Sequence, residues 1–437
     1  MALALLATPA LAAGLALPPP VTDADYRPVR IEEAQLGRLL FFDPVLSGNR
    51  NISCATCHHP RFATTDGVSL GLGEGGVGLG PDRVGDPDNM PEQRIPRNAP
   101  ALFNLGAHEF TVMFHDGRIE VDPSRPSGLR TPLEEEMVAG FASLLSARTM
   151  FPVLSPDEMA GHYGENDVSR AVRQGLITAE GGAWDVIARR VAAIPEYQAL
   201  FAAVYPEIDA GRPLHFTDIS DAIAAFVEFE FRSDTSPFDA VLRGEATLSP
   251  LAQAGMALFY GEARCATCHA GPFLTDHGFH PRGSPQLGPG KAERFERHSR
   301  DEGRIRVTGR AEDAYAFRTP SLRNVARTGP WGHAGGHSDL EAFLRFHADP
   351  VAALDDWDPA SATLPAFAAV KPDLALRANA PEWAAIREAA SRVPPIPLEE
   401  GDVEALLAFL HTLTDEKALA GRLGIPERVP SGLPVER

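Results

Sequence analysis

The pentapeptide Cys-Ala-Thr-Cys-His occurs twice in this chain, at residues 54–58 and again at residues 265–269. Each copy holds two thiols separated by two residues, with a histidine directly after the second thiol. Thiols at this spacing can form thioether bonds to the vinyl groups of one haem, and the adjacent histidine can bind the haem iron. The sequence therefore predicts two covalently bound c-type haems. The predicted attachment residues are Cys54, Cys57, Cys265 and Cys268, and the predicted iron ligands are His58 and His269.

Other uses of the four cysteines fit the sequence less well. A zinc site would need both Cys-x-x-Cys pairs to fold around one ion, yet the pairs lie roughly 210 residues apart, beyond the usual ligand spacing. One copy could instead be a thioredoxin-like dithiol, but that role would not require a histidine at the same offset in both copies. Structural disulfides are favoured least, because haem attachment would use all four thiols.

The size and charge of the chain indicate an acidic globular protein. Its 437 residues exceed the roughly 100 to 200 usual for one domain, so we expect two domains. Hydrophobic residues make up 44% and charged residues 23%, enough apolar surface for sizeable cores. The net charge of −19 argues against a nucleic-acid partner. It is compatible with a redox partner that has a basic face, or with a solvated acidic surface that binds no partner.

The first thirteen residues are rich in alanine and leucine, and Ala10 and Ala12 stand as in an Ala-x-Ala cleavage site. We expect a secretory signal peptide over residues 1–13, truncated at its start because the usual basic segment is missing. No later stretch approaches the roughly 18 apolar residues of a membrane span. Because haem of this kind is attached outside the bacterial cytoplasm, we expect the mature protein in the periplasm.

A short repeat precedes each haem motif. Residues 36–41 and 254–259 share the pattern Gly-x-x-Leu-Phe and have apolar residues at helical spacing. The glycine in each would let another helix approach closely. A helical apolar stripe that could cross such an opening helix is formed by Val403, Leu406, Leu407, Leu410 and Leu413.

A short helix followed by a haem motif is typical of a cytochrome c domain. We therefore predict a mainly α fold with two cytochrome c-like haem domains in tandem and little strand. Residues 218–231 have the pattern of a helix, and residues 232–250 that of a linker. We place the boundary near Pro237, which gives an N-terminal domain over residues 21–237 and a C-terminal domain over 238–437.

Residues 67–80 are rich in glycine and contain Gly71-x-Gly73-x-x-Gly76. This pattern would indicate a dinucleotide site only between a strand and a helix. Since it follows a haem motif, we expect a loop near the first haem instead.

The order of several short segments resembles that of the bacterial dihaem cytochrome c peroxidase and MauG family. These segments run from about residue 36 to about residue 413, and their fixed order carries the resemblance. In chain order they are residues 36–58, 97–100, 114–118, 158–159, 236–239, 265–269 and 317–325. The resemblance implies an N-terminal haem at which peroxide reacts and a C-terminal haem that stores and relays an electron.

Two acidic residues match the family's distal positions on the N-terminal haem. Glu158 matches the distal acid, which can move a proton between the two peroxide oxygens as their bond breaks. Its ordinary alternative is a solvated glutamate. Glu136 stands where the family usually has glutamine, and two acids near one iron would raise the pKa of one of them.

The second ligand of the C-terminal haem distinguishes members of the family, with methionine in peroxidases and tyrosine in MauG. The matching position holds His347, so the resemblance implies bis-histidine ligation and a lower potential than methionine would give. His333 and His337 are nearby competitors. On the N-terminal haem, no histidine occurs between His59 and His108, so we expect an open or water-bound iron. Met90 is a weaker candidate ligand there.

The family's inter-haem tryptophan position holds His115 in this chain. Trp331 is a candidate electron relay in its place, although a lone tryptophan is more often part of a core. The resemblance also implies a calcium ion at the domain junction, bound by oxygens of Asn98, Thr328 and Pro330. The alternative is a turn without an ion.

The expected function is that of a periplasmic dihaem c-type peroxidase, which reduces hydrogen peroxide to water with electrons from a small cytochrome c or cupredoxin. One alternative is a MauG-like enzyme that uses peroxide-derived high-valent iron to oxidise residues of a partner protein. A second alternative is an electron carrier without peroxide chemistry, which predicts two six-coordinate haems.

Overall fold

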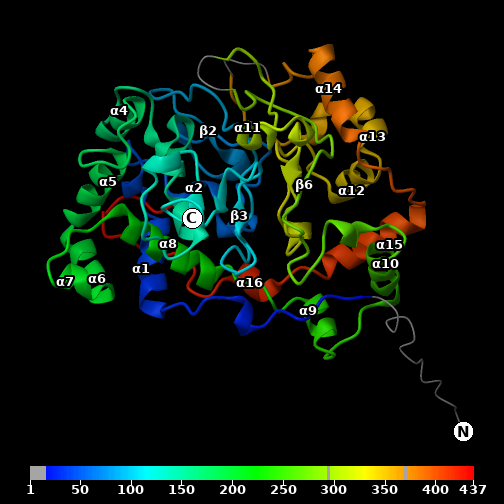
Figure 1. The fold of residues 1–437 in the computed structure, drawn as a ribbon, viewed down its shortest axis with the longest axis horizontal. Helices are drawn as coiled ribbons and strands as arrows, with labels where there is room; N and C mark the ends of the chain where they lie inside the picture. Colours follow the sequence, from blue (N-terminus) through cyan, green and yellow to red (C-terminus); the bar gives the residue numbers. More distant parts are fainter. Residues whose placement is uncertain (1–15, 293–295, 369–372) are drawn as a thin grey trace, which may run out of the picture.

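The computed structural model describes residues 16–292, 296–368 and 373–437. The predicted signal peptide over residues 1–13 lies outside the described residues. Within them the chain is mainly helical, and its strands are two or three residues long (Figure 1). The predicted mainly α fold with little strand is therefore confirmed. No helix in the described part of the chain is long and apolar enough to cross a membrane.

Most helices of the two halves lie on opposite sides of the molecule in Figure 1, whereas α16 lies near the middle and packs on the first half. Those of the N-terminal half are α1 (Ile31–Phe41), α2 (Cys54–Cys57), α3 (Leu144–Thr149), α4 (Asp167–Arg173), α5 (Ala183–Ala192), α6 (Pro195–Val204), α7 (Pro206–Asp209) and α8 (Phe216–Glu230). Those of the C-terminal half are α9 (Pro237–Leu242), α10 (Pro250–Tyr260), α11 (Ile305–Thr308), α12 (Leu340–Ala348), α13 (Pro350–Asp356), α14 (Ala380–Ala390), α15 (Glu400–His411) and α16 (Glu416–Ala420).

The strands form small antiparallel sheets between the helices. One pairs β1 (Gly76–Val77) with β2 (Val84–Gly85), a second has the order β3 (Val112–Met113), β4 (Ile119–Val121), β5 (Leu129–Arg130), and a third pairs β6 (Phe279–His280) with β7 (Phe317–Arg318). Because strands this short bury little surface, the fold depends on helix packing.

A pair of crossing helices forms the centre of each half. Helix α1 packs on α8 at Gly37, where an added Cβ would lie 1.7 Å from the carbonyl oxygen of Ala222. Helix α10 packs on α15 at Gly255, where an added Cβ would lie 1.8 Å from the carbonyl oxygen of Ala405. The close approach that the sequence predicts at each glycine is confirmed, and so is the crossing of α10 by the apolar stripe.

Two large hydrophobic cores follow these helix pairs. The first gathers buried residues between Val21 and Phe231, and the second gathers buried residues between Phe238 and Leu413. The first core also takes in a few residues from later in the chain, among them Phe273. The domain boundary near Pro237 stays a prediction.

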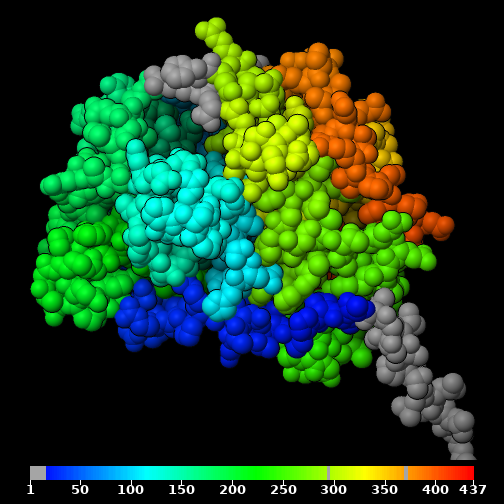
Figure 2. All heavy atoms as spheres, in the orientation of Figure 1, coloured from blue at the N-terminus to red at the C-terminus, as the bar shows by residue number. Residues whose placement is uncertain are grey.

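Both ends of the described chain cross between the halves. The N-terminal segment runs along the lower edge of the molecule (Figure 2), with Leu17 on the second core and Tyr26 bonded to Asn104 of the first half. The C-terminal segment returns to the first haem motif, where the Glu436 carboxylate accepts a hydrogen bond from Thr56. This return places the end of the chain beside α2.

Candidate functional site

The first haem motif presents a histidine ready to bind a metal. The motif forms the single turn of α2, and His58 follows it directly. The Nδ1 of His58 lies 3.0 Å from the carbonyl oxygen of Thr64, to which it donates, so Nε2 is left for a metal. Burial, followed by the positive charge of Arg148, lowers the pKa of His58 to about 4. The ring is therefore neutral at physiological pH, as iron ligation requires.

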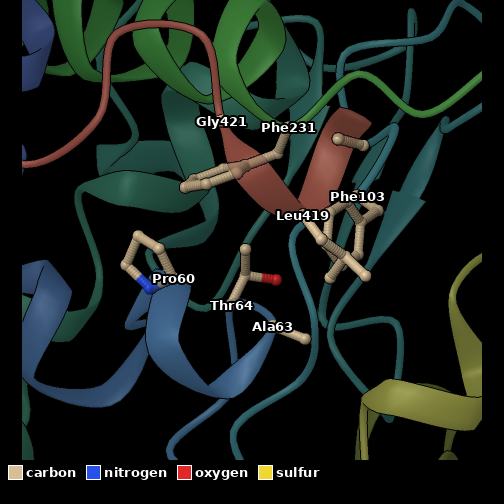
Figure 3. Close-up of a pocket in the computed structure, with 8 residues that line it drawn as sticks. Pro60, Ala63, Thr64, Phe103, Phe231, Leu419 and Gly421 are labelled. Carbon is tan, nitrogen blue, oxygen red and sulfur yellow. The ribbon is translucent and has the colours of Figure 1, made fainter. Parts of the chain in front are cut away.

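A small apolar cavity lies between the loop that holds His58 and helix α16 (Figure 3). Its walls are formed by Pro60, Ala63, Thr64, Phe103, Phe231, Ala418, Leu419 and Gly421. These residues carry no charge, so we interpret the cavity as part of the packing behind the proximal histidine.

The second haem motif repeats this arrangement. Cys265 begins a single 3-10 turn, Cys268 follows it, and the Nδ1 of His269 donates to the carbonyl oxygen of Leu274 at 3.2 Å. Burial lowers the pKa of His269 to about 4. Both motifs thus offer a neutral histidine with its Nδ1 fixed by a backbone carbonyl, half-buried at His58 and buried at His269.

Two alternative uses of the cysteines, the disulfides and the zinc site, find no support in the structure. All four cysteines are unpaired thiols, so they form no disulfide. Among the described residues, one group of three side chains could hold a metal ion, namely Cys268, Asp276 and His280. Since this group contains one cysteine, a zinc site built from both Cys-x-x-Cys pairs is wrong.

The structure brings His347 of α12 opposite His269, with the ring centroids 6.2 Å apart. When two imidazoles bind the same metal ion from opposite sides through bonds of about 2 Å, their ring centroids lie a little over 6 Å apart. The Nδ1 of His347 is buried without a hydrogen-bond partner, and burial followed by the charge of Arg282 lowers the pKa of this ring well below its usual value. These residues fit a haem iron bound on both faces.

The competing histidines are held by aromatic neighbours. His333 stacks on Phe317 with ring centroids 3.8 Å apart, and His337 packs on Phe346 at 4.8 Å. The geometry therefore favours His347 over both as the partner of His269.

Glu158 lies in a single π-helical turn, Pro156–Ala160. The glycine-rich loop packs closely on this turn, since a Cβ at Gly73 would lie 3.0 Å from the Cα of Glu158. Burial raises the pKa of Glu158, and the nearby cations Lys291, Arg118 and Arg148 oppose that rise. Glu158 is thus a half-buried carboxyl group in a cationic environment rather than a fully solvated glutamate.

Two arginines of this pocket are held by Phe114. The guanidinium of Arg118 lies over the Phe114 ring at 4.5 Å and that of Arg148 at 5.2 Å. Arg118 also pairs with Asp116 at 3.3 Å, whereas Arg148 has no ion pair among the described residues. The charge of Arg148 acts on both His58 and Glu158, lowering the pKa of each group. A buried guanidinium without an ion pair can stabilise an anionic group.

Two further distal candidates gain no support from the structure. Glu136 is exposed in the turn Glu134–Glu136, so it does not share the buried environment of Glu158. Met90 is 51% exposed at the protein surface. Both roles stay predictions, and only Glu158 enters the proposal below.

A buried ion-pair network joins the two halves close to this pocket. Arg97 binds Asp301 through two hydrogen bonds of 2.6 and 2.8 Å and pairs with Asp116 at 2.6 Å. Beside it, the Nε2 of His115 lies 3.1 Å from the carbonyl oxygen of Asn98. His115 therefore lies beside this network, and its match to the inter-haem position stays a prediction.

Trp331 and the calcium candidates also lie in the described part of the chain. The Nε1 of Trp331 donates to Val325 at 3.0 Å, and its ring stacks on Phe343. The amide nitrogen of Asn98 donates to the carbonyl oxygens of Val68 and Ser69, and the Thr328 hydroxyl donates to Val325. Pro330 is buried. The electron relay and the calcium ion both stay predictions.

The sequence interpretation did not identify the cations around Glu158. Arg118 lies within one of the segments that resemble the family, residues 114–118, and could have been singled out there. Arg148 and Lys291 lie outside those segments, and their proximity to Glu158 depends on the tertiary fold.

Comparisons with known proteins agree with this geometry. A family model described as di-haem cytochrome c peroxidase matches residues 31–247. The methylamine utilization protein MauG of Methylorubrum extorquens is 29% identical over 338 residues, which cover 77% of this chain and 74% of that protein. The cytochrome c551 peroxidase of Pseudomonas aeruginosa is 28% identical over 320 residues, which cover 73% of this chain and 72% of that protein.

A solved structure shares the fold over nearly the whole chain. The crystal structure of a MauG-like protein associated with microbial copper homeostasis has a TM-score of 0.59 and 26% sequence identity, and the match covers 92% of this chain and 94% of that one. Together with the two haem motifs, these matches show that the chain belongs to the di-haem cytochrome c peroxidase and MauG family, an oxidoreductase family whose members carry two c-type haems.

Proposed function

We propose that this chain is a periplasmic dihaem peroxidase that reduces hydrogen peroxide to two water molecules with two electrons and two protons. The observation that carries the proposal is the half-buried Glu158 carboxyl group, on which the charges of Lys291, Arg118 and Arg148 act. Such a pocket supplies a proton acceptor and positive charge, and heterolysis of an O–O bond needs both. A pure electron carrier has no use for them.

When bound, the N-terminal haem supplies the iron that holds peroxide and takes part in its reduction. His58 would hold this iron, and its Nδ1–H bond to Thr64 makes the ring a stronger ligand. Glu158 would take the proton from one peroxide oxygen and give it to the other, which leaves as water. Arg118 and Arg148 would stabilise the negative charge that develops on the leaving oxygen.

The C-terminal haem would receive electrons one at a time from a small cytochrome c or cupredoxin. His269 and His347 would hold its iron from both faces. His115 and Trp331 are the candidates for the path between the haems. A calcium ion on Asn98, Thr328 and Pro330 would belong to the same junction, between haem domains that we divide near Pro237.

A MauG-like oxidation of a partner protein is the second candidate function. Histidine at position 347 in place of the peroxidases' methionine favours it, because bis-histidine ligation lowers the potential of the electron-storing haem. Relatives named MauG also support it.

The decisive experiment follows peroxide consumption and optical spectra of the purified dihaem protein, with and without a reduced small cytochrome. Sustained turnover that oxidises two cytochromes per peroxide is the expected result. A long-lived oxidised spectrum with little turnover would favour the MauG-like function, and spectra indifferent to peroxide would contradict both.

A further inference from the structure

Other segments of the chain hold the single turn Pro156–Ala160, which carries Glu158. A turn this short leaves its last carbonyl groups without partners inside the helix. Three of its carbonyl oxygens accept hydrogen bonds from outside instead. The donors are the amide of Glu74 to Asp157 at 2.9 Å, the amide of Gly48 to Met159 at 2.8 Å, and the side-chain amide of Asn166 to Ala160 at 3.0 Å. These donors fix the backbone on both sides of Glu158.

The side chain of Glu74 gathers three asparagines. Glu74 is 1% exposed, and its Oε1 accepts hydrogen bonds from the side-chain amides of Asn49 at 2.9 Å, Asn51 at 2.8 Å and Asn89 at 2.8 Å. Its Oε2 is buried without a hydrogen-bond partner among the described residues. Because a carboxylate oxygen can accept several hydrogen bonds, one buried glutamate joins three side chains here. We call these four residues the Glu74 network.

Asn49 connects this network to the far end of the turn. The Oδ1 of Asn49 accepts a hydrogen bond from the Nδ2 of Asn166 at 2.9 Å, and the same Nδ2 donates to Ala160. Gly48, next to Asn49, lies so close to the turn that an added Cβ would be 1.9 Å from the carbonyl oxygen of Ala160. Glu74 therefore holds the turn twice, directly through its own amide and indirectly through Asn49 and Asn166.

The Glu74 network also includes the segment that leads into the first haem motif. Asn49 and Asn51 stand shortly before Cys54 in the chain. The Ser47 hydroxyl accepts hydrogen bonds from the amides of Asn51 and Ile52, which fixes the path between them and the motif. Because the haem would be bonded to Cys54, a network that joins this segment to the distal turn sets the turn's position relative to the haem.

A second buried glutamate shows a simpler use of the same residue type. Glu230 is also 1% exposed, and its carboxylate accepts hydrogen bonds from the backbone amides of Arg422, Leu423 and Gly424. It anchors one stretch of the C-terminal segment. Glu74 instead gathers side chains from separate stretches of the chain. A buried carboxylate is costly unless it is hydrogen-bonded, so both glutamates depend on these donors.

We propose that Glu74 is a positioning residue for the peroxide reaction, whose buried carboxylate holds the turn that carries Glu158 in register with the first haem motif. The inference rests on the proposed function, because it specifies what places the distal acid. Reaction rates are sensitive to such placement, since a misplacement of about 1 Å can slow a reaction on the order of a hundredfold.

The test measures peroxide consumption per haem by the purified dihaem protein at saturating reduced small cytochrome. Glu74→Leu removes the acceptor and should slow the reaction about tenfold, but by no more than Glu158→Gln does. Glu74→Gln keeps an oxygen that can accept from the asparagines and places its amide nitrogen where Oε2 has no partner. It should therefore retain most of the rate. Glu230→Leu, the matched control, should leave the rate unchanged.

Asn166→Asp breaks the same connection without disturbing the buried carboxylate. Aspartate keeps the side-chain oxygen that accepts a hydrogen bond from the amide of Ser169 at the start of α4, and it is as good a residue at that position as asparagine. It cannot donate to Ala160 or to Asn49. The variant should therefore fold and slow peroxide consumption in the same direction as Glu74→Leu.

Combination with Glu158→Gln separates positioning from a general loss of structure. If Glu74 acts through Glu158, neither Glu74→Leu nor Asn166→Asp should slow the Glu158→Gln protein further. Fully additive slowing, a Glu74→Gln protein as slow as Glu74→Leu, or an unchanged rate in Asn166→Asp would overturn the inference alone. A Glu158→Gln protein as fast as the unmodified one would overturn both the inference and the distal role of Glu158.

Discussion

His347 lies opposite His269 with the two ring planes inclined by 45° and the ring centroids 6.2 Å apart. His347 extends from α12, and Arg282 donates a hydrogen bond to its backbone carbonyl oxygen. His269 is fixed by the carbonyl oxygen of Leu274. The His269 ring and the His347 backbone are therefore each held by a hydrogen bond to or from the main chain.

This relationship gives the first prediction. His347→Gly should leave both haems attached but convert the C-terminal iron from low spin to high spin, because one of its two strong-field ligands is lost. Electron paramagnetic resonance and optical spectra of the ferric protein measure the change. His333→Gly is the control and should stay low spin, since His333 is stacked on Phe317. A low-spin C-terminal haem in His347→Gly would identify His333 or His337 as the ligand.

The second prediction concerns Glu158. Glu158→Gln should slow peroxide consumption at least about tenfold, because glutamine cannot accept and return a proton. Asp157→Asn is a matched control on the same turn, where the carboxylate accepts a hydrogen bond from Gln93 at 2.6 Å. It should change the rate much less. Equal rates for Glu158→Gln and the unmodified protein, measured at saturating reduced cytochrome, would remove Glu158 from the reaction.

A site residue could be predicted from the sequence when the atoms that its chemistry needs lie close together in the chain. The haem motifs and their histidines could be identified because all the necessary atoms lie within five consecutive residues. His347 could be placed because a helix fixes the spacing of its residues. Glu136 could not be judged, since only packing decides that the turn Glu134–Glu136 faces solvent.

The same distinction holds for the fold, where local features could be predicted and their distant packing partners could not. Gly37 and Gly255 predict close helix crossings, because a missing side chain inside an apolar helix has a direct steric meaning. Neither glycine specifies its partner, and the contact of α1 with α8 depends on residues far along the chain. The close packing of Gly288 on Leu70 likewise joins segments far apart in the chain, and no local pattern encodes it.

The third prediction concerns the pH dependence of stability through Asp66. Asp66 is buried, and burial raises its pKa to about 7 although the amide of Val68 donates to its carboxylate. The folded protein therefore binds this proton more tightly than the unfolded chain, in which the pKa is near 3.8. The resulting stabilisation is present below about pH 4 and is lost as the pH rises through about 7.

Asp66→Asn removes this dependence because asparagine stays neutral. The variant should raise the free energy of unfolding, by on the order of a few kcal/mol at pH 8 and by less at pH 5. Thermal unfolding of the dihaem protein at both pH values measures the difference. Asp88→Asn, at an exposed aspartate of the same half, should change neither value. A gain that is the same at both pH values would show that titration of Asp66 is not its cause.

The last prediction compares alanine substitutions at two glycines of the α10 and α15 helix pair. Gly255→Ala should destabilise the protein by about 3 kcal/mol or more, because the new methyl group would overlap the backbone of Ala405 and force α10 away from α15. Gly401→Ala, in the first turn of α15, meets no atom within 4 Å and should stabilise the helix by roughly 0.5–1 kcal/mol. Thermal unfolding of the two variants should therefore shift in opposite directions. Two shifts of the same sign would mean that the backbones of α10 and α15 are not in contact at Gly255.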